Sequence, residues 1–535
     1  MTQEVLLGDE AVALGAIHAG MSAGYSYPGT PASEIMEFLV KKSRTDGGFI
    51  ASWCVNEKVA YEEALGVSFA GKRAMVSMKH VGLNVAADPF MNSALIPIGG
   101  GLVVVVADDP GMHSSQNEQD SRYYAQFAKI FCFEPSNHQE AYDMTRAAFD
   151  LSEANSIPVL IRLVTRLSHN RSRIIVKPPC KQKKISAGGG PDWTLLPLNA
   201  RRRFQKLIER QGDLVRISEG SEFNQIELKK KSTKIGIIAS GIAHRYVKEN
   251  IHAFPQEYSL LKISTYPLPE TLIKKLVGHV DTVLVVEEGY PFIESQIKGI
   301  FGVPDKDIRG KLSGHLSATG ELTPDNVRQA LGLESRPRQT SKDFPLASRP
   351  PQLCQGCSHS DTFRALNKAL ESYPQPAVFS DIGCYTLGAL PPYNAIDTCV
   401  CMGASVSMAK GGAEAGLSPS LAVIGDSTFG HSGLTPLLDA AAAGTNMTVI
   451  IADNATVAMT GGQPSFASGD RLIRIIEGLG ISKEHIKVIV PLPKNLTENV
   501  KIIKEEIDHN GLSVIVSFRE CVQETRKRAR RRSTK

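Results

Sequence analysis

Short runs of aliphatic and β-branched residues alternate with helix-like stretches along most of the chain, and this alternation limits the fold more than any other feature. In residues 1–167 the strand-like runs include "RAMVSMK" (73–79), "GLVVVVAD" (101–108) and "IPVLIRLV" (157–164). Stretches with helical spacing that end at glycine, such as "NEKVAYEEALGVSFAG" (56–71), lie between them. Such alternation predicts parallel sheets covered by helices.

Two further parts of the chain repeat this alternation. Residues 233–333 contain three strand-like runs, and residues 354–520 contain four, among them "LAVIGD" (421–426) and "MTVIIADN" (447–454). Stretches rich in Pro, Gly and charge separate the parts. We therefore predict an α/β protein of three doubly wound parallel-sheet domains, divided into a first domain (1–167), a connector with little sheet of its own (168–232), a second domain (233–333), a linker (334–353), a third domain (354–520) and a basic tail (521–535).

The balance of charge says little about partners. The chain has 535 residues, 42% of them hydrophobic, which is enough for several buried cores. Its net charge of +5 is smaller than the charge of the run "RKRARRR" at 526–532, so the rest is close to neutral. Such a run can contact nucleic acid or an acidic lipid surface, but a solvated, disordered chain end is the commoner case. We predict no nucleic-acid or membrane partner.

The sequence also indicates a cytoplasmic protein. The first residues, "MTQEVLLGDEAVALGAI", lack a basic segment followed by an apolar core, and therefore do not resemble a secretory signal. The longest apolar runs, such as "GGGLVVVVA" (99–107), are shorter than the about 20 residues that span a bilayer. The nine cysteines are an odd number and do not suggest a disulfide framework.

Two short polar motifs follow neighbouring strand-like runs in the third domain. Gly-Asp-Ser at 425–427 closes one run, and Asp-Asn at 453–454 closes the next, so that Asn454 comes 28 positions after Asp426. A strand-helix-strand crossover spans such a distance, so both side chains are expected at the carboxyl edge of one parallel sheet. A carboxylate, an amide oxygen and a backbone carbonyl suit Mg²⁺, and the set predicts a diphosphate site held through a metal. A helix-capping Asp explains Gly-Asp-Ser alone, but not the "DN" and "TGGQ" that follow it.

These positions resemble the signature of the thiamine diphosphate enzymes, which begins Gly-Asp-Gly and ends in Asn-Asn. The chain differs from it at Ser427 and Asp453, and neither change removes a metal ligand of the motif. The resemblance implies Mg²⁺ bound by Asp426, Asn454 and the carbonyl of Thr456. It also implies that the cofactor contacts a set of residues around this edge: Gly425, Asp426, Ser427, Thr428, Asn454, Gly383, Cys384 and Gly403.

Longer motifs carry a closer resemblance. They are "SYPGTPASEI" (26–35), "WCVNEKVAYEEALG" (53–66), "MKHVGLNVAADP" (78–89), "DDPGMHSSQNEQDSRYYAQFAKI" (108–130), "LCQGCSH" (353–359), "DIGCYTLG" (381–388) and "IDTCVCMGAS" (396–405). Together they are similar to the large subunit of indolepyruvate:ferredoxin oxidoreductase, from about residue 6 to residue 521. That family implies oxidative decarboxylation of an aryl 2-oxoacid, such as indolepyruvate or phenylpyruvate, to an acyl-CoA, with electrons passed to ferredoxin.

The resemblance also implies an assembly. It implies a small partner subunit of the beta or gamma type and a thiamine site formed between the first and last domains. The second domain resembles the transketolase C-terminal type, which usually builds subunit contacts. We therefore expect a dimer or a larger hetero-oligomer.

By its position in the motif, Glu57 is the candidate glutamate that activates the cofactor through its aminopyrimidine ring. A helical surface glutamate is the alternative interpretation, and it fits Glu62 and Glu63. Thr30 resembles the threonine that binds the substrate carboxylate in related pyruvate enzymes. It can also serve as a helix N-cap, with Pro31 in the first helical position.

Four further residues are candidates for substrate binding and proton transfer. Arg122 or Lys79 is expected to pair with the substrate carboxylate, and His80 or His113 to move protons. A single His or Arg is more often structural, so these four roles depend on where the fold places the side chains.

Five cysteines gather in one region: Cys354, Cys357, Cys384, Cys399 and Cys401. Cys354, Cys357 and Cys384 are candidate ligands of a [4Fe-4S] cluster, with Cys399, Cys401 or Cys521 as the fourth. Zinc is the other metal that such pairs bind, and reduced thiols lining a cofactor pocket would have the same spacing.

The family's large subunit ends in a ferredoxin-like domain with two runs resembling Cys-x-x-Cys-x-x-Cys-x-x-x-Cys-Pro, and this sequence contains neither. We therefore expect either a separate subunit that carries the clusters or a reaction that is not linked to ferredoxin. Two alternatives remain: a non-oxidative thiamine diphosphate-dependent decarboxylase or carboligase, and a non-catalytic subunit. Intact Glu57, Asp426 and Asn454 argue against the last one.

Overall fold

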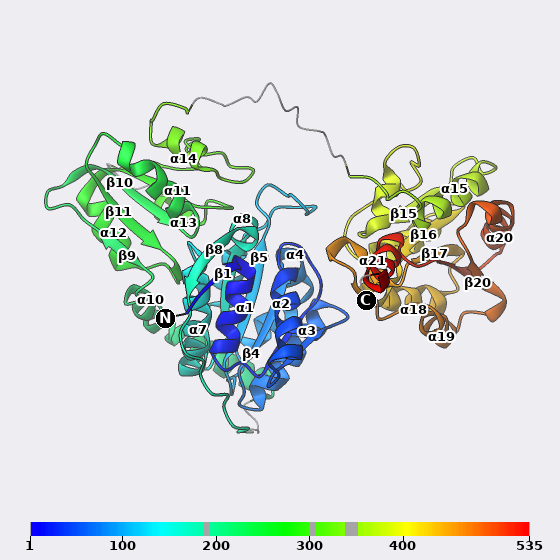
Figure 1. Ribbon diagram of the computed structural model, residues 1–535, viewed down its shortest axis with the longest axis horizontal. Helices are drawn as coiled ribbons and strands as arrows, with labels where there is room; N and C mark the ends of the chain where they lie inside the picture. The colour runs from blue at the N-terminus through cyan, green and yellow to red at the C-terminus, as the bar shows by residue number, and fades with distance from the viewer. Residues whose placement is uncertain (1, 187–192, 300–305, 337–350, 534–535) are drawn as a thin grey trace. The chain divides into compact units, whose positions relative to one another are not determined.

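The computed structural model divides the chain into two units, Met1–Thr340 and Ser341–Lys535, which are described separately (Figure 1). It describes residues 2–186, 193–299, 306–336 and 351–533. Most of the linker predicted at 334–353 lies outside the described residues. Within them, no helix is long and apolar enough to cross a membrane.

The first unit contains a seven-stranded sheet. Its order is β12 (Thr265–Tyr266), β6 (Phe131–Phe133), β7 (Val159–Val164), β5 (Leu102–Asp108), β4 (Ala74–Lys79), β2 (Ala23–Ser26) and β3 (Ile50–Trp53). All neighbouring strands are parallel except β12, which pairs with β6 in the antiparallel sense. The three strand-like runs predicted here form β4, β5 and β7, which are buried along their whole length because helices cover both faces.

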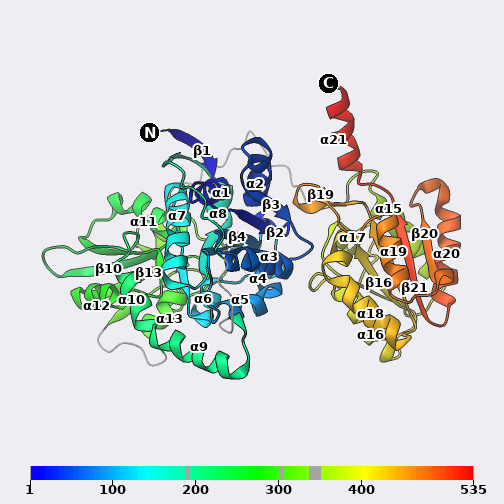
Figure 2. The same ribbon diagram turned by 90° about the horizontal axis from the view of Figure 1, so that it is seen from below.

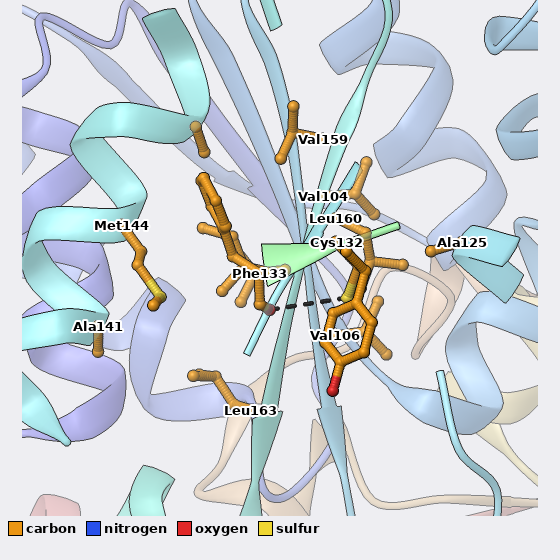
Figure 3. Close-up of a cluster of buried hydrophobic side chains, with 14 of the residues drawn as sticks. Val104, Val106, Ala125, Cys132, Phe133, Ala141, Met144, Val159, Leu160 and Leu163 are labelled. Atoms are coloured by element: carbon orange, nitrogen blue, oxygen red, sulfur yellow. Dashed lines mark hydrogen bonds between the residues drawn. The ribbon is translucent and has the colours of Figure 1, made fainter. Parts of the chain in front are cut away.

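Helices cover the two faces of this sheet. On one face α1 (Gly8–His18) packs between α2 (Ser33–Thr45) and α7 (His138–Asn155). On the other face an edge-to-face chain of rings, Tyr61 to Phe90 to Tyr124, joins α3 (Glu57–Phe69), α5 (Ala87–Ser93) and α6 (Arg122–Ala128). Figure 3 shows the core between these layers, with Met144 of α7 on one side of the strands and Ala125 of α6 on the other. The Cys132 thiol in this core donates to the carbonyl of Phe133 at 3.7 Å.

A five-stranded sheet is also part of the first unit. Its order is β14 (Asp307–Arg309), β13 (Val280–Val286), β10 (Thr233–Ser240), β11 (Tyr258–Ile263) and β9 (Gln225–Glu227), and only β9 is antiparallel to its neighbour. Its helices are α11 (Ala243–Asn250), α12 (Glu270–His279), α13 (Phe292–Lys298) and α14 (Pro324–Ala330). Because β12 follows β11 directly and joins β6, backbone hydrogen bonds connect this part of the chain to the seven-stranded sheet.

The segment expected to be a connector, 168–232, contains helices. β8 (Arg171–Ile175) pairs with β1 (Gln3–Leu7), and α9 (Pro197–Glu209) and α10 (Gln211–Glu219) follow. Figure 2 shows α9 along the edge of the first unit. The short helices α4 (His80–Val85) and α8 (Thr165–His169) follow β4 and β7 directly.

The main sheet of the second unit has five parallel strands, and a short antiparallel pair, β18 (Thr456–Val457) with β19 (Gln463–Pro464), lies beside it in sequence. The order of the main sheet is β15 (Ala377–Ser380), β16 (Ser420–Gly425), β17 (Met447–Asp453), β21 (Leu512–Phe518) and β20 (Ile486–Ile489). α15 (Ser358–Leu370) packs against α20 (Leu496–Asp508), and α16 (Ala404–Glu414) packs against α18 (Leu434–Ala443). The predicted α/β class with parallel sheets is confirmed in both units.

The prediction of a disordered basic tail is wrong. Val522–Ser533 form a helix, α21, after β21. Arg, Lys, Gln and Ala are good helix formers, and a Lys527–Glu524 pair of 2.6 Å stabilises the first turns.

Candidate cofactor and active site

Asp426 lies where β16 becomes a helix. Gly425 is the last residue of the strand, and Asp426 opens a helix that runs through α17 (Asp426–Thr428), one π-helical turn η4 (Phe429–Gly433) and α18. A Cβ at Gly425 would lie 2.5 Å from Cε1 of Tyr385, so only glycine fits there. This helix start lies at the carboxyl edge of the sheet, which is a favourable place for an anion.

Asp426 and Asn454 lie at the same sheet edge because β16 and β17 are parallel neighbours, with Gly425 opposite Ala452. Asp426 is 2% exposed, and its Oδ2 has no hydrogen-bond partner among the described residues. Burial, and next the charge of Asp453, raises the pKa of Asp426 well above its usual value. A bound cation would stabilise a buried carboxylate that has an oxygen without a hydrogen bond.

His359 orients Asn454. The Asn454 amide donates from Nδ2 to Nε2 of His359 at 3.2 Å, and its Oδ1 accepts from the backbone amide of Thr456 at 3.1 Å. Burial lowers the pKa of His359 to about 4, so the ring is neutral and can accept this bond. The amide oxygen and the Thr456 backbone are thereby held together beside Asp426, and these oxygens fit a magnesium ion.

Asp453, where the thiamine signature has Asn, holds the loop that carries Thr456. Its Oδ1 accepts from the Ala455 amide at 3.0 Å and the Ser468 hydroxyl at 2.7 Å, and its Oδ2 accepts from the Gly469 amide at 2.7 Å. Ala455 has a φ of 62°, a left-handed conformation that costs free energy outside glycine and is here supported by the Asp453 bond. With both oxygens engaged, Asp453 is a support for the site and not a further ligand.

Asp426, Asn454 and Thr456 form one side of the candidate cofactor site, which we call the wall around Asp426. Glycines form the rest of this wall. Gly403 has a φ of 84°, and a Cβ there would lie 2.6 Å from Cβ of Ser432. Gly383 packs directly on the ring of Tyr385, which also covers Gly425 and donates from its hydroxyl to Asp381. Thr428 donates to the carbonyl of Ile382 at 3.0 Å and so joins the helix start to the 381–383 loop.

Asp381 supports the same loop. Its Oδ2 accepts from the Ser405 hydroxyl at 2.6 Å, and burial raises the pKa of the carboxyl to about 6. Sequence reasoning did not identify Asp381, Tyr385 or His359 as part of the site, although all three lie in motifs that it quoted. Each is a polar residue at the end of a strand or the start of a helix, and this position could have identified all three from the sequence.

Four cysteine thiols come together beside this wall. Burial raises the pKa of Cys384 to about 12, and the next causes are the thiols of Cys357, Cys521 and Cys354. Cys357 has the same neighbours, Cys354 and Cys521. Cys521 also donates its backbone amide to the carbonyl of Asn454 at 3.1 Å. Of the three cysteines that the sequence left open as the fourth thiol, the structure brings Cys521 to the group, whereas Cys399 interacts with Cys401 and Asp381.

In the first unit, Glu57 is the first residue of α3. Asn56 caps this helix by accepting the Val59 amide at 2.9 Å, which fixes the direction in which Glu57 leaves the backbone. Glu57 is 5% exposed and lies against Gly82 of α4, where a Cβ would be 2.7 Å from both Cγ and Oε1 of Glu57. A glycine is therefore needed at position 82 for the glutamate to keep this position.

Lys79, at the end of β4, lies beneath the "YPGTP" loop. Its Nζ donates to the carbonyl of Ser114 at 2.6 Å, and the Ser114 hydroxyl donates to the carbonyl of Thr30 at 3.2 Å. Burial lowers the pKa of Lys79 to about 8, and the opposing charge of Asp109 limits the shift. Asp109 anchors the loop that carries Ser114 by accepting the Ser114 amide at 2.8 Å.

The two histidines differ in burial. His80 is 1% exposed, its Nε2 lies 3.2 Å from the carbonyl of Asn117, and its Nδ1 has no hydrogen-bond partner among the described residues. His113 has a half-exposed side chain, and its Nε2 lies 3.5 Å from Glu321 Oε2.

Arg122 does not have the place that the sequence analysis gave it. Its side chain is fully buried and donates to Asp120 at 2.9 Å, to Glu287 at 2.9 Å and to the carbonyls of Glu288 and Tyr290 at 3.0 and 3.1 Å. Every N–H of the guanidinium is used within the protein, so none is left to bind a substrate carboxylate. The prediction of a substrate-binding role for Arg122 therefore has to be corrected to a structural one.

Two family models match the chain. The C-terminal TPP-binding domain of thiamine pyrophosphate enzymes matches residues 381–516, and the thiamine diphosphate-binding domain of pyruvate flavodoxin/ferredoxin oxidoreductases matches residues 14–189. Together with the fold and the wall around Asp426, they define a thiamine diphosphate-dependent enzyme.

Curated relatives give the family. Indolepyruvate oxidoreductase subunit IorA of Archaeoglobus fulgidus is 38% identical over 99% of this chain and 88% of its own length. The same subunit of Methanothermobacter thermautotrophicus is 36% identical over 97% of this chain and 86% of its own length. The chain belongs to this family of indolepyruvate oxidoreductase subunits and is a thiamine diphosphate-dependent 2-oxoacid oxidoreductase. The resemblance drawn from the sequence motifs is confirmed.

A solved structure agrees in fold. The 2-oxoglutarate:ferredoxin oxidoreductase from Magnetococcus marinus matches with a TM-score of 0.50 and 16% identity, over 62% of this chain and 65% of its own. At this identity the match concerns the fold alone.

Proposed function

We propose that this chain is the catalytic subunit of an oxidoreductase that converts aryl 2-oxoacids of the indolepyruvate type to acyl-CoA and CO₂. The two electrons released in the decarboxylation pass to ferredoxin, and CoA takes the acyl group. The observation that carries the proposal is the buried, incompletely partnered Asp426 beside Asn454 and Thr456, in a chain whose relatives are named indolepyruvate oxidoreductase subunits.

In this proposal Asp426, Asn454 and the carbonyl of Thr456 hold Mg²⁺, and the helix start at Ser427 and Thr428 receives the diphosphate. The unpartnered Oδ2 of Asp426 and the oriented amide of Asn454 support these assignments. When bound, thiamine diphosphate supplies the nucleophilic carbon and the electron sink that decarboxylation needs. Gly383, Cys384, Gly403 and Gly425 line the same wall and leave room for the cofactor.

Glu57 is the carboxyl group that hydrogen-bonds to the aminopyrimidine ring of the cofactor. Its burial against Gly82 supports this role, because a carboxyl group kept from water can exchange a proton with a ring nitrogen without competition from solvent. Glu57→Gln removes the proton exchange and keeps the shape.

Lys79 and Thr30 are the residues that we propose for the substrate carboxylate. Lys79 replaces Arg122 in this role because its ammonium is buried next to the "YPGTP" loop and donates only to the Ser114 carbonyl and hydroxyl among the described residues. His80, with its unfilled Nδ1, is the group placed to move protons there.

We further propose that Cys354, Cys357, Cys384 and Cys521 bind a [4Fe-4S] cluster. Among the described residues no three cysteine sulfurs all lie within 4.8 Å of one another, whereas a tetrahedral zinc site with Zn–S bonds of about 2.3 Å needs sulfurs about 3.8 Å apart. The arrangement is therefore not that of a closed zinc site, and the grouping of Cys354, Cys357 and Cys521 around Cys384 supports the cluster.

The proposed assembly consists of this chain, a small partner subunit of the beta or gamma type and ferredoxin or a separate ferredoxin-like subunit, in the cytoplasm. The names of the relatives, which describe one subunit of an oxidoreductase, support the partner. A dimer or a larger hetero-oligomer is the expected state.

The test is anaerobic purification with the subunits that co-purify, followed by iron and acid-labile sulfide analysis and by indolepyruvate- and CoA-dependent viologen reduction. We expect iron, acyl-CoA formation and dye reduction, all activity being lost in Glu57→Gln while thiamine diphosphate still binds. Asp426→Ala should lose cofactor binding itself. Cofactor binding without iron, with an aldehyde as product, would contradict the proposal and indicate the non-oxidative alternative.

A further inference from the structure

Two carboxylates and an imidazole from three helices meet beside the start of α1. Asp9 and Glu34 are the second residues of α1 and α2, and His169 is the last residue of α8. One ligand atom from each lies within 4.8 Å of the other two. α1 contacts both α2 and α8, and Figures 1 and 2 show the three helices side by side.

Asp9 is the member of this group that the protein leaves without partners. Its side chain is 0% exposed, and neither of its carboxylate oxygens has a hydrogen-bond partner among the described residues. Burial raises the pKa of Asp9 well above its usual value, and the nearby Ser168 hydroxyl and His169 only partly oppose this. Buried carboxylates are normally paired, hydrogen-bonded or bound to a metal, so a fully buried and unpartnered one requires a further group.

The other two members present the geometry of a metal site. His169 Nε2 lies 3.4 Å from Glu34 Oε2. Ligands about 2.0–2.2 Å from a tetrahedral zinc ion are about 3.3–3.6 Å apart, so this pair already has the separation of two zinc ligands. The Glu34 and His169 side chains are 33% and 35% exposed, which leaves a path by which an ion and a water ligand can enter.

The chemistry of the ligand set selects the ion. Two carboxylates and one imidazole form a mixed oxygen and nitrogen set, which suits zinc and related divalent transition metals better than the all-oxygen preference of Mg²⁺ or Ca²⁺. We infer that Asp9, Glu34 and His169 bind a divalent transition-metal ion, with Asp9 as the buried ligand and water in the remaining position. Because the three ligands come from α1, α2 and α8, the ion would fasten these helices to one another.

The experiment is a zinc titration of the full chain, purified with its partner subunits under anaerobic conditions and stripped of metal with a chelator. Wild type is compared with Asp9→Asn, which keeps the shape of the buried side chain, and with His169→Gln, which changes a partly exposed residue and so does not threaten folding. His113→Gln is the matched control, because His113 faces Glu321 at 3.5 Å and no third ligand group joins this pair among the described residues. Zinc affinity and stoichiometry are measured by calorimetry, and the shift in melting temperature is recorded with and without zinc.

We expect wild type and His113→Gln to bind one more zinc equivalent than Asp9→Asn and His169→Gln, or to bind it at least about 100-fold more tightly. The reason is that even the loss of a residue that only hydrogen-bonds to a metal ligand lowers metal affinity by about 10–100-fold. Zinc should raise the melting temperature by a larger amount in the first two proteins. Equal zinc binding in all four would overturn the inference and would identify Asp9 as a carboxyl group that is simply protonated. This result is independent of catalysis, since no activity is measured.

Discussion

Buried charged residues of this chain differ in whether the protein itself supplies their partners. Arg122 and Arg162 are surrounded by carboxylates and donate in every direction. Asp426 and Asp9 are equally buried, yet each keeps at least one oxygen without a hydrogen-bond partner among the described residues. Leaving a buried acceptor without a hydrogen bond costs free energy. A buried carboxylate that lacks a partner, such as Asp426 or Asp9, therefore indicates a bound group, whereas the fully paired arginines have a structural role.

Lys79 provides a pH test of the proposed substrate site. Its pKa of about 8 lies below the usual value because the ammonium is buried. The charged form, which is the form that binds a carboxylate, is therefore present below pH 8 and is lost as the pH rises through about 8. We expect kcat/KM for the 2-oxoacid to fall above that pH, as measured by viologen reduction over a pH series.

Arg in place of Lys79 is the matched variant. Its guanidinium stays protonated beyond pH 12, so Lys79→Arg should lose the falling limb near pH 8, whatever the loss of absolute rate. Lys79→Met should raise KM below about pH 8, and its difference from wild type should shrink above that pH. An unchanged falling limb in Lys79→Arg would show that another group titrates there.

At the scale of elements, the packing of α4 on α3 sets the position of Glu57. A Cβ at Gly82 would lie 2.7 Å from Cγ of Glu57, so Gly82→Ala must displace the glutamate. We expect this variant to bind thiamine diphosphate and Mg²⁺ normally by calorimetry but to lose activity by at least about tenfold, because small misplacements of a catalytic group are costly.

Gly66→Ala is the control for that variant. Gly66 is also a helical glycine, in α3, but a Cβ there meets nothing within 4 Å. It should leave activity unchanged and raise stability slightly, by about 0.5–1 kcal/mol, since alanine is the better helix former. If Gly82→Ala and Gly66→Ala lost the same activity, the loss in Gly82→Ala could not be attributed to displacement of Glu57, and the prediction would be wrong.

The loop after β17 depends on one side chain. Asp453 accepts from the amides of Ala455 and Gly469 and from Ser468, and these three bonds close the loop that carries the Thr456 carbonyl. We expect Asp453→Ala to weaken binding of thiamine diphosphate with Mg²⁺ by about 10–100-fold and to speed hydrogen exchange at Ala455 and Gly469. Asp470→Ala, at an exposed position next to the loop, should do neither.

At the scale of the molecule, a buried ion network joins the seven-stranded and the five-stranded sheet of the first unit. Arg122 and Arg162 share Asp120 and Glu134, and Arg162 also pairs with Asp108. Arg122 in turn reaches Glu287, just after β13 of the five-stranded sheet, at 2.9 Å. This network explains why the first and second predicted domains form one unit, Met1–Thr340, although the domain boundaries themselves remain a prediction.

Arg122→Met tests whether this residue is structural. It leaves several buried carboxylates without their cation, and we expect a loss of about 3–5 kcal/mol in the free energy of unfolding of the first unit, measured by denaturant. At denaturant concentrations below the unfolding transition, KM for the 2-oxoacid should be the same as in wild type. Arg216→Gln, which removes an exposed pair with Asp213, should cost at most about 1 kcal/mol. A raised KM with normal stability would restore Arg122 as a substrate ligand.

Local sequence patterns predicted the strands that are runs of aliphatic and β-branched residues. These are β4, β5, β7, β10, β11, β13, β15, β16, β17 and β20, of which β15 and β20 have only four residues. β2 ("AGYS"), β3 ("IASW") and β6 ("FCF") were missed because each has at most one aliphatic β-former among its three or four residues and so shows no apolar run. β21 ("LSVIVSF") has the readable pattern and was overlooked. The tail was predicted to be disordered from its charge, although its residues favour a helix.

The sequence by itself determined the class of fold, the thiamine family and the edge of the sheet where Asp426 and Asn454 meet, because strand period, turn glycines and motif spacing are local properties of the chain. Only the tertiary structure decided that Arg122 is engaged in a buried network, that Cys521 joins Cys354, Cys357 and Cys384, and that Asp9 lies unpartnered beside Glu34 and His169. Each of these outcomes depends on which residues, distant in sequence, share a desolvated space. Desolvation decides whether a charged side chain needs a partner from the protein or from a bound ligand.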